Sequence, residues 1–273
     1  GQLGDGSSSA SSIPLSASGV FLGQYQGTPV LSARSSSSCS STRLGNSDEM
    51  KCWGSSGALP DEHNDLVGAS KLSLGTGFGC MVIEETINNV AGKRVKCWGS
   101  NAYNKLGRAG AASTTPTLIA GSLFAIDVSA HYNTACAVLA ADADDTVGQA
   151  YCWGQNGNNG LHGNGERNGP SPSAPVAVAG VTGVSQITVG SATVCATQPG
   201  GNVKCWGNGS NSTPLGGGPN TPTLLPATVV QRQGNSYSAL NGITQVASGQ
   251  QHMCARSNAG HAYCWGSSSR GVL

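Results

Sequence analysis

The chain has 273 residues, of which only 10% are charged, and 14 Lys and Arg against 13 Asp and Glu give a formal net charge of +1. This balance argues against a nucleic-acid partner, because neutralising phosphates requires a clustered basic surface. The sequence holds no run of 18 or more apolar residues, so we expect no membrane insertion by a helix. The length suits a single all-β domain, which we predict over residues 1–273.

A Cys-Trp-Gly tripeptide recurs five times and contains every Trp of the chain. It occupies residues 52–54, 97–99, 152–154, 205–207 and 264–266. Successive Trp residues are 45, 55, 53 and 59 positions apart, a spacing typical of propeller blades or solenoid units. We predict five repeats, with approximate bounds 1–54, 55–99, 100–154, 155–207 and 208–273.

A second Cys precedes each tripeptide, and an alternating pattern leads up to it. Eight residues before this Cys the position is always apolar: Leu31, Leu72, Val128, Ile187 and Val246. Six residues before it the side chain is small or apolar: Ala33, Leu74, Ala130, Val189 and Ser248. A period of two predicts a strand with one packed face in every repeat.

The two Cys of a repeat flank a predicted β-hairpin. The intervening turns are Gln-Pro-Gly-Gly-Asn at 198–202 in the fourth repeat and Ser-Asn-Ala-Gly at 257–260 in the fifth. A hairpin centred midway places the two Cys directly opposite each other, within reach of a disulfide. The predicted bonds are Cys39–Cys52, Cys80–Cys97, Cys136–Cys152, Cys195–Cys205 and Cys254–Cys264.

Two other uses of the cysteines were weighed. The alternative to disulfides is that the Cys residues are reduced and buried, and pack as small hydrophobic side chains. The presence of two Cys in every repeat is hard to explain in that way. Zinc is disfavoured, since no pair has the close spacing of a zinc knuckle and His residues do not recur with the pairs from repeat to repeat. Stable disulfides imply an oxidising compartment, which we expect to be extracellular, the cell surface or the periplasm.

The repeat resembles the RCC1-like propeller repeat. The resemblance is carried by Gly-Gln-Gln-His-Met-Cys-Ala at 249–255, Tyr-Cys-Trp-Gly at 263–266 and Gly-Gln-Leu-Gly-Asp-Gly at 1–6. The resemblance implies an all-β β-propeller, and the five counted repeats and five predicted bonds make it five-bladed with one disulfide per blade. Because the chain begins inside the motif's tail, we expect an N-terminal strand to complete the last blade and close the ring, and we expect a domain excised from a larger protein.

The blade number departs from the family pattern. Most relatives with this repeat have seven blades, whereas five are counted here. A compact five-bladed ring is the favoured interpretation, and five blades of a longer array are the alternative.

The turns that precede the first Cys of each repeat differ, although the flanking strands repeat. Variation confined to one rim of a rigid scaffold predicts a ligand site there. The candidate ligand-binding residues are Arg34, Phe78, His131, Tyr132, Asn133, Gln250, Gln251 and His252. Aromatic rings beside amides suit a sugar or a polar protein epitope. Ordinary solvated turns are the alternative, and His252 suits a structural role because the family pattern has His there.

The blade connections on the same face are rich in polar residues. They contribute Asn101, Tyr103, Asn104, Asn156, Asn158, Asn159, His162, Asn208 and Asn211. A structural role for these residues is favoured over ligand binding, because Asn and Gly tolerate the left-handed turns of such loops.

Catalytic motifs are absent from the sequence, so we predict a binding protein without a cofactor. It contains no Gly-x-Ser-x-Gly, His-Glu-x-x-His or Walker pattern. Asp142, Asp144 and Asp145 form an acidic turn, but the twelve-residue calcium-loop pattern is missing and a solvated turn is favoured over a metal site.

Three functions were compared. The first is an adhesin-like recognition domain of a bacterial surface protein, such as a fibre tip, that binds a glycan or a surface protein of another cell. If the domain is part of such a fibre, it can form a trimer through the parent protein. The second is a secreted, protein-binding enzyme inhibitor, which the RCC1-like family includes. The third, nucleotide exchange on a small GTPase, is disfavoured by the cysteine usage and the lack of a basic surface.

Overall fold

The computed structural model describes residues 30–34, 37–44, 47–54, 62–63, 69–121, 124–207, 216, 223–233, 235–250 and 252–266. Within these residues, the strands form five sheets of three or four strands and one separate two-stranded hairpin. The all-β, five-bladed propeller predicted from the repeats is confirmed.

Every blade is an antiparallel meander that runs from an inner to an outer strand in chain order. Blade 1 holds β1 (Val30–Arg34), β2 (Ser37–Leu44), β3 (Ser47–Gly54) and β4 (Glu62–His63), and blade 2 holds β5 (Ala69–Gly75), β6 (Phe78–Ile87), β7 (Val90–Gly99) and β8 (Ser113–Leu118). Blade 3 holds β9 (Phe124–His131), β10 (Thr134–Ala140), β11 (Gln149–Gly154) and β12 (Val176–Ala177). Blade 4 holds β13 (Gln186–Val189), β14 (Thr193–Gln198), β15 (Asn202–Gly207) and β16 (Thr223–Thr228). Blade 5 holds β19 (Ile243–Ser248), β20 (His252–Ser257) and β21 (Ala262–Gly266).

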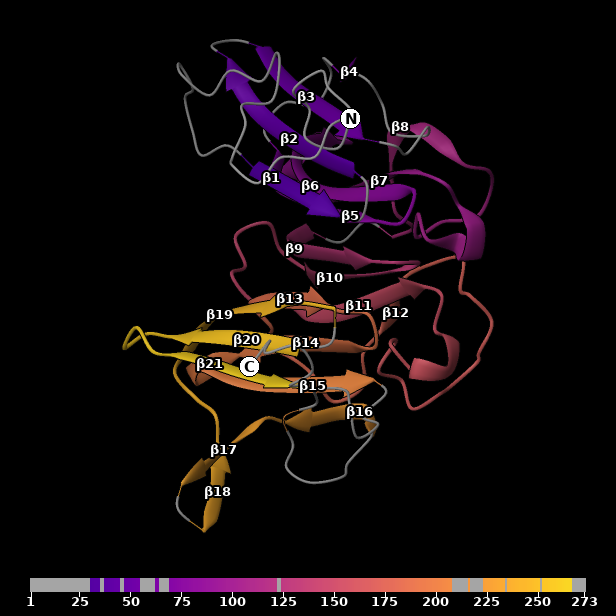
Figure 1. Cartoon of the computed structure of the whole chain (residues 1–273). Helices are drawn as coiled ribbons and strands as arrows, with labels where there is room; N and C mark the ends of the chain where they lie inside the picture. The colour runs from indigo at the N-terminus through magenta and orange to yellow at the C-terminus, as the bar shows by residue number, and fades with distance from the viewer. Residues whose placement is uncertain are drawn as a thin grey trace.

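The inner strands of successive blades pack beside one another in the order β1, β5, β9, β13 and β19. Blade 1, in indigo, and the yellow strands of blade 5 are separated in Figure 1 by blades 2 and 3. The predicted closing strand falls within residues 1–29, which lie outside the described residues.

All five predicted disulfides are present, and the alternative of reduced cysteines is wrong. Each bond joins the second and third strands of its blade at directly opposed residues. The Cα atoms of the bonded pairs are 4.0 to 4.1 Å apart. The predicted hairpin register therefore holds in every blade.

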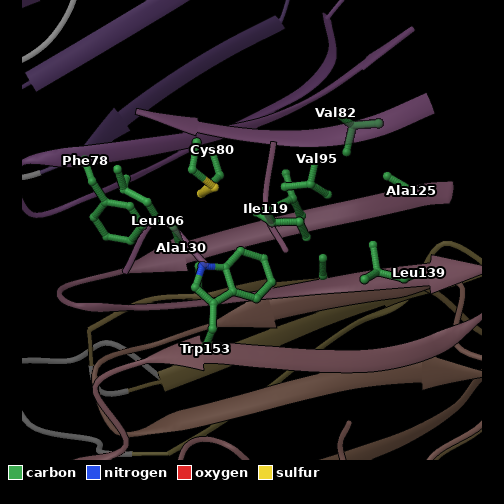
Figure 2. Close-up of a cluster of buried hydrophobic side chains, with 14 residues drawn as sticks. Phe78, Cys80, Val82, Val95, Leu106, Ile119, Ala125, Ala130, Leu139 and Trp153 are labelled. Carbon is green, nitrogen blue, oxygen red and sulfur yellow. A yellow bond between two sulfur atoms is a disulfide. The ribbon is translucent and has the colours of Figure 1, made fainter. Parts of the chain in front are cut away.

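The hydrophobic core lies between the blades. Figure 2 shows one such interface, where Phe78, Cys80 and Val82 of blade 2 face Leu139 and Trp153 of blade 3. Because side chains alternate along a strand, one face of each sheet packs on the preceding blade and the other face on the following blade. The disulfide belongs to the face that the following blade covers.

Two of the repeated Trp residues, Trp153 and Trp206, tie their blades to the loop of the preceding blade. The indole Nε1 of Trp153 donates to the carbonyl oxygen of Lys105 at 3.0 Å, and that of Trp206 donates to the carbonyl of Leu161 at 2.9 Å. Gly163 has φ +62°, and a Cβ on it would lie 2.8 Å from the Trp206 Nε1 atom. Only glycine therefore fits this close contact.

Two of the repeated Asn residues have structural roles in the blade connections. The Oδ1 atoms of Asn101 and Asn156 accept the backbone N–H groups of Leu106 and His162, both at 2.9 Å. The Asn156 Nδ2 atom also donates to the Glu166 carbonyl at 3.0 Å. These bonds fold the loop over the blade, which supports the structural interpretation of these two residues.

The sheets do not coincide with the predicted repeats. Strand β8, at 113–118, falls in the third predicted repeat, yet it pairs with β7 of blade 2. The outer strand of a blade therefore comes from the repeat that follows it. A separate hairpin of β17 (Val230–Gln233) and β18 (Ser236–Ala239) stands between β16 and β19, and it projects from the propeller in Figure 1.

Candidate functional site

A pocket of about 390 Å³ opens on the face that carries the variable turns. This volume lies in the range of about 300–1,000 Å³ found for small-ligand sites. The β5–β6, β9–β10 and β13–β14 turns and the segment after β11 meet there. The lining residues are Thr76, His131, Tyr132, Asn133, Thr134, Gln155, Asn156, Gly157, Asn158, Asn159, Leu161 and Ser191. The predicted rim and the blade connections therefore share one hollow, and His131, Tyr132 and Asn133 lie in it.

Tyr132 is the exposed aromatic ring of the pocket. Its side chain is 44% exposed, and its backbone has φ +46°, a left-handed conformation that is uncommon for a bulky residue. The ring contacts that of His131 edge to face at 4.4 Å between centroids. Gln250 Nε2 donates to the Tyr132 hydroxyl at 3.4 Å. The turn and its neighbours thus hold a partly exposed Tyr132 in the lining of the pocket.

His131 and Asn133 flank Tyr132 and differ in their bonding. Asn133 accepts from the Lys105 Nζ atom through Oδ1 at 3.2 Å and donates from Nδ2 to the Oε1 atom of Gln155 at 3.0 Å. His131 is buried, and its Nδ1 atom has no hydrogen-bond partner among the described residues. Both polar atoms of the Asn133 side chain are thus hydrogen-bonded within the protein, whereas the Nδ1 atom of His131 is not.

Lys105 supports the pocket from below. Its Nζ atom donates to the carbonyl of Thr76 at 2.8 Å as well as to Asn133, so it joins two of the turns that form the pocket. Burial lowers the pKa of Lys105 from its usual value of 10.5. The residues that line the pocket carry no Asp, Glu, Lys or Arg. The pocket is therefore polar but formally uncharged.

His162 lies behind the lining residue Leu161 and is buried. Burial lowers the pKa of His162 from 6.5 to about 4, and a hydrogen bond with the backbone of Gly154 opposes this effect in part. The buried ring is therefore neutral near pH 7.

Gln250 and His252 lie next to the pocket, over blades 4 and 5. They share a small hollow with Ser191, whose hydroxyl donates to the Gln250 carbonyl. The His252 ring lies against Gly249, where an added Cβ would come within 2.3 Å of it. This packing supports the structural interpretation of His252, whereas Gln250 is exposed beside Tyr132.

The structure corrects the placement of Phe78. It is the first residue of β6 and is fully buried in the interface between blades 2 and 3, so its ring is closed to a ligand (Figure 2). The physical reason is strand alternation, because Phe78 lies two residues before Cys80 and shares its covered face. The side chain of Arg34 and the whole of Gln251 lie outside what the structure describes.

Gln155 is a pocket residue that the sequence interpretation missed. It follows Gly154 directly, and besides contacting Asn133 it accepts the Thr134 hydroxyl at its carbonyl at 2.6 Å. The signal was present in the internal repeats. The residues at the same position after the other tripeptides are Ser55, Ser100, Asn208 and Ser267, so blade 3 has the largest side chain there.

The described residues contain neither a metal-binding cluster nor a membrane-spanning helix. No group of three or more His, Cys, Asp and Glu is placed to hold a metal ion there, and Asp142, Asp144 and Asp145 are exposed in the β10–β11 turn. No helix in the same part of the chain is long and apolar enough to cross a membrane.

Comparison with known proteins identifies the repeat. The model of the regulator of chromosome condensation (RCC1) repeat matches residues 243–272, which include all three strands of blade 5. This match covers one blade, and the likeness of the rest of the chain to known proteins lies in the fold. Human WBSCR16 has a similar fold, with a TM-score of 0.66 and 18% identity over 87% of this chain and 61% of that one. Yeast RCC1 (Prp20), solved bound to Kap60, gives a TM-score of 0.64 and 19% identity over 86% of this chain and 55% of that one.

A similar fold also occurs in the ectodomain of the receptor kinase CR4 from Physcomitrella patens. The TM-score is 0.51 and the identity is 20%, over 86% of this chain and 50% of that one. The chain thus spans between half and 61% of the length of these three proteins.

Proposed function

We propose that this RCC1-like propeller is an extracellular recognition domain that binds a neutral polar ligand, a glycan or a cell-surface epitope, in the pocket beside Tyr132. The observation that carries the proposal is the composition of the pocket. A half-exposed tyrosine stands among amides and hydroxyls, and no charged side chain lines the hollow.

This lining suits a sugar in two ways. The open part of the Tyr132 ring offers an apolar surface to the C–H groups of a pyranose, and Asn158 and Asn159 offer amide donors and acceptors to its hydroxyls. An anionic or cationic ligand would lose its hydration here without gaining a partner of opposite charge.

The buried Nδ1 atom of His131 adds a second argument. A buried polar atom without a partner costs on the order of 1–3 kcal/mol, and a ligand group that bonds to it recovers that cost. Because the atom is shielded from solvent, a ligand gains this bond only if the His131 ring turns toward the pocket when the ligand binds.

The extracellular setting rests on the disulfides. Five bonds in one chain require an oxidising compartment to persist. The fold also has a counterpart in a receptor ectodomain. An adhesin-like role at a cell surface fits both observations.

The test is a glycan array probed with the whole 273-residue chain, followed by calorimetric titration of the oligosaccharides that bind. We expect Tyr132→Ala to weaken binding by about tenfold or more, since it removes the stacking ring. Tyr103→Ala is the matched control, because Tyr103 is equally exposed, has φ +63° and does not line the pocket. An array without binders, or equal losses in the two variants, contradicts the proposal.

A protein-binding enzyme inhibitor is the second candidate. It is favoured by the similar Prp20p from Saccharomyces cerevisiae, whose binding to Gsp1p and histones has been examined, and by two exposed tyrosines, Tyr103 and Tyr132, in loops of one face. Protein anchors are often Tyr or Trp at the centre of an interface. Capture of a secreted enzyme that is lost with Tyr132→Ala, together with an empty glycan array, favours this candidate.

A further inference from the structure

Gln155 and Asn159 are amide side chains that line the pocket, and each bonds to a group that fixes its orientation. The two ends of an amide differ for a ligand, because the oxygen only accepts hydrogen bonds and the NH₂ group only donates them. The end that is left free in the pocket therefore decides which kind of ligand group can bind there.

The orientation of Gln155 begins at Lys105. A lysine ammonium only donates, so Asn133 has to turn its Oδ1 atom toward the Lys105 Nζ atom, at 3.2 Å. The Asn133 Nδ2 atom is then the end that donates to Gln155, and the Gln155 Oε1 atom accepts at 3.0 Å. This leaves the Gln155 NH₂ group as a donor that has no partner among the described residues, in a side chain that lines the pocket.

The buried lysine also strengthens that donor. The Lys105 Nζ atom is held by the Thr76 carbonyl at 2.8 Å and lies 5.3 Å from the centre of the Phe78 ring. In a chain of hydrogen bonds that starts at a positive charge, each bond polarises the next one. The Gln155 NH₂ group thus carries part of the effect of this charge into a pocket with a formally neutral lining, where it favours a ligand oxygen.

Asn159 has the opposite orientation. Its Nδ2 atom donates to the backbone carbonyl of Ser191 at 3.4 Å, and a carbonyl oxygen can only accept. The Asn159 Oδ1 atom is therefore the free end, without a partner in the part of the chain that the structure describes. The pocket thus presents one fixed donor and one fixed acceptor, in the same hollow as the partly exposed Tyr132 ring.

We propose that the sugar bound in this pocket is N-acetylated, and that Gln155 and Asn159 bind its acetamido group. This inference rests on the proposed function and names its ligand class. An acetamido group has one carbonyl oxygen, which accepts from the Gln155 NH₂ group, and one N–H, which donates to the Asn159 Oδ1 atom. Leu161, the aliphatic side chain of the lining, offers a surface to the methyl group. Asn133 is a positioning residue, because it acts on the ligand through Gln155.

The test uses pairs of monosaccharides that differ only in this group. The whole 273-residue chain is titrated with N-acetylglucosamine and glucose, and with N-acetylgalactosamine and galactose, and binding is followed by NMR. In at least one pair we expect the N-acetylated sugar to bind about tenfold more tightly, which is the effect of one or two well-placed hydrogen bonds. Tyr132→Ala should weaken both members of that pair by a similar factor, because both lose the same ring.

Two variants remove or reverse the donor. Gln155→Met keeps a similar shape without the NH₂ group, so the preference for the N-acetylated sugar should fall to about twofold or less. In Asn133→Asp, one carboxylate oxygen accepts from Lys105 and the other faces Gln155, which has to turn its NH₂ group toward it and its oxygen toward the pocket. This variant should prefer the unacetylated sugar. Asn258→Asp is the matched control, because it adds the same charge in the exposed β20–β21 turn and should leave the preference unchanged.

The outcomes separate this inference from the proposed function. Sugars that bind without a preference for the acetamido group, and lose affinity in Tyr132→Ala, overturn the inference and leave the pocket as a glycan site. A preference that persists in Gln155→Met and in Asn133→Asp also overturns it, since the acetamido group is then bound elsewhere. Failure of all four sugars to bind up to about 10 mM overturns it as well, and the glycan array then judges the proposed function by itself. Circular dichroism shows whether the variants are folded, and each of the two tests the donor without the other.

Discussion

Blade 3 and blade 5 are built from the same repeat but have different surroundings. Trp153 and the Cys136–Cys152 bond of blade 3 are fully buried, because blades lie on both sides. In blade 5, Trp265 is only partly buried and Cys264 is exposed. The comparison separates what the motif determines locally, namely the hairpin and the disulfide, from burial, which depends on a neighbouring blade.

The largest difference is expected for the repeated Trp. Trp153→Ala removes a fully buried ring and its hydrogen bond to Lys105, and it should lower the free energy of unfolding by roughly 3–5 kcal/mol. Trp265→Ala should cost less than half as much, because part of its ring is already in water. Guanidinium unfolding followed by circular dichroism measures both, and equal costs would mean that blade 5 is as well packed as blade 3.

The second prediction concerns pH and the loop of blade 3. The pKa of His162 is about 4 in the folded chain and near 6.5 in the unfolded one, so protons bind preferentially to the unfolded state. The contribution of the neutral His162 ring to the free energy of unfolding is complete above about pH 6.5. It is lost progressively toward pH 4, by roughly 3 kcal/mol in total.

His162→Gln should flatten this loss between pH 7 and pH 4.5 in chemical denaturation. The matched control is His261→Gln, which makes the same substitution at an exposed position in blade 5. A profile that is the same in all three proteins would show that His162 is not the responsible group.

The inner-strand acceptors offer a third comparison. The Oδ2 atom of Asp127, nine residues before Cys136, accepts the backbone N–H of Ile187 at 2.9 Å, and Gln245 occupies the same position before Cys254 but is exposed. Asp127→Ala leaves the buried N–H of Ile187 without its partner and should cost about 1–3 kcal/mol, whereas Gln245→Ala should change the free energy of unfolding by about 0.5 kcal/mol or less. Burial raises the pKa of Asp127, against the opposing effects of the Ile187 N–H and Lys71. Asp127→Asn keeps an acceptor without the buried charge and should be tolerated, and a loss as large as that of Asp127→Ala would assign the charge a role of its own.

The smallest effect on the fold is expected from mild reduction. Cys254–Cys264 should open before any bond of blades 2 to 4, because a thiolate can reach an exposed sulfur and cannot reach a buried one. Stepwise alkylation and peptide mass spectrometry give the order. If Cys136–Cys152 opens first, blade 3 is less well covered than its burial indicates.

Much of the fold could be predicted because the repeats act as internal copies. Alignment on the first Cys located the inner strands, and the short turns between paired Cys residues determined the hairpin register and all five disulfides. The outer strands were harder to assign, because β8 follows the Trp of its own sheet by more than a dozen residues and reads as the start of a new repeat. Their pairing depends on contacts between distant residues, which a local pattern does not contain.

The candidate site could be predicted only in part. The His131, Tyr132 and Asn133 turn was located because it differs from the other turns, but Phe78 was assigned to the rim although strand alternation places it with Cys80. Gln155 was missed because its importance comes from the bond to Asn133 across two connections. A turn residue lines a pocket only when other loops lie close to it. Those loops come together only after the blades have packed, which a local sequence pattern does not show.

The outer strand of a blade comes from the repeat that follows it, and this determines where blades can be added to or removed from such a chain. A cut at the Cys-Trp-Gly motif would strip each sheet of its last strand, whereas a cut between an outer strand and the next inner strand leaves every sheet whole. Blades can therefore be gained or lost cleanly only at junctions such as 119–123, 178–185 and 229–242. The last of these already holds the additional β17–β18 hairpin, so it is the junction at which an engineered insertion should be accommodated best.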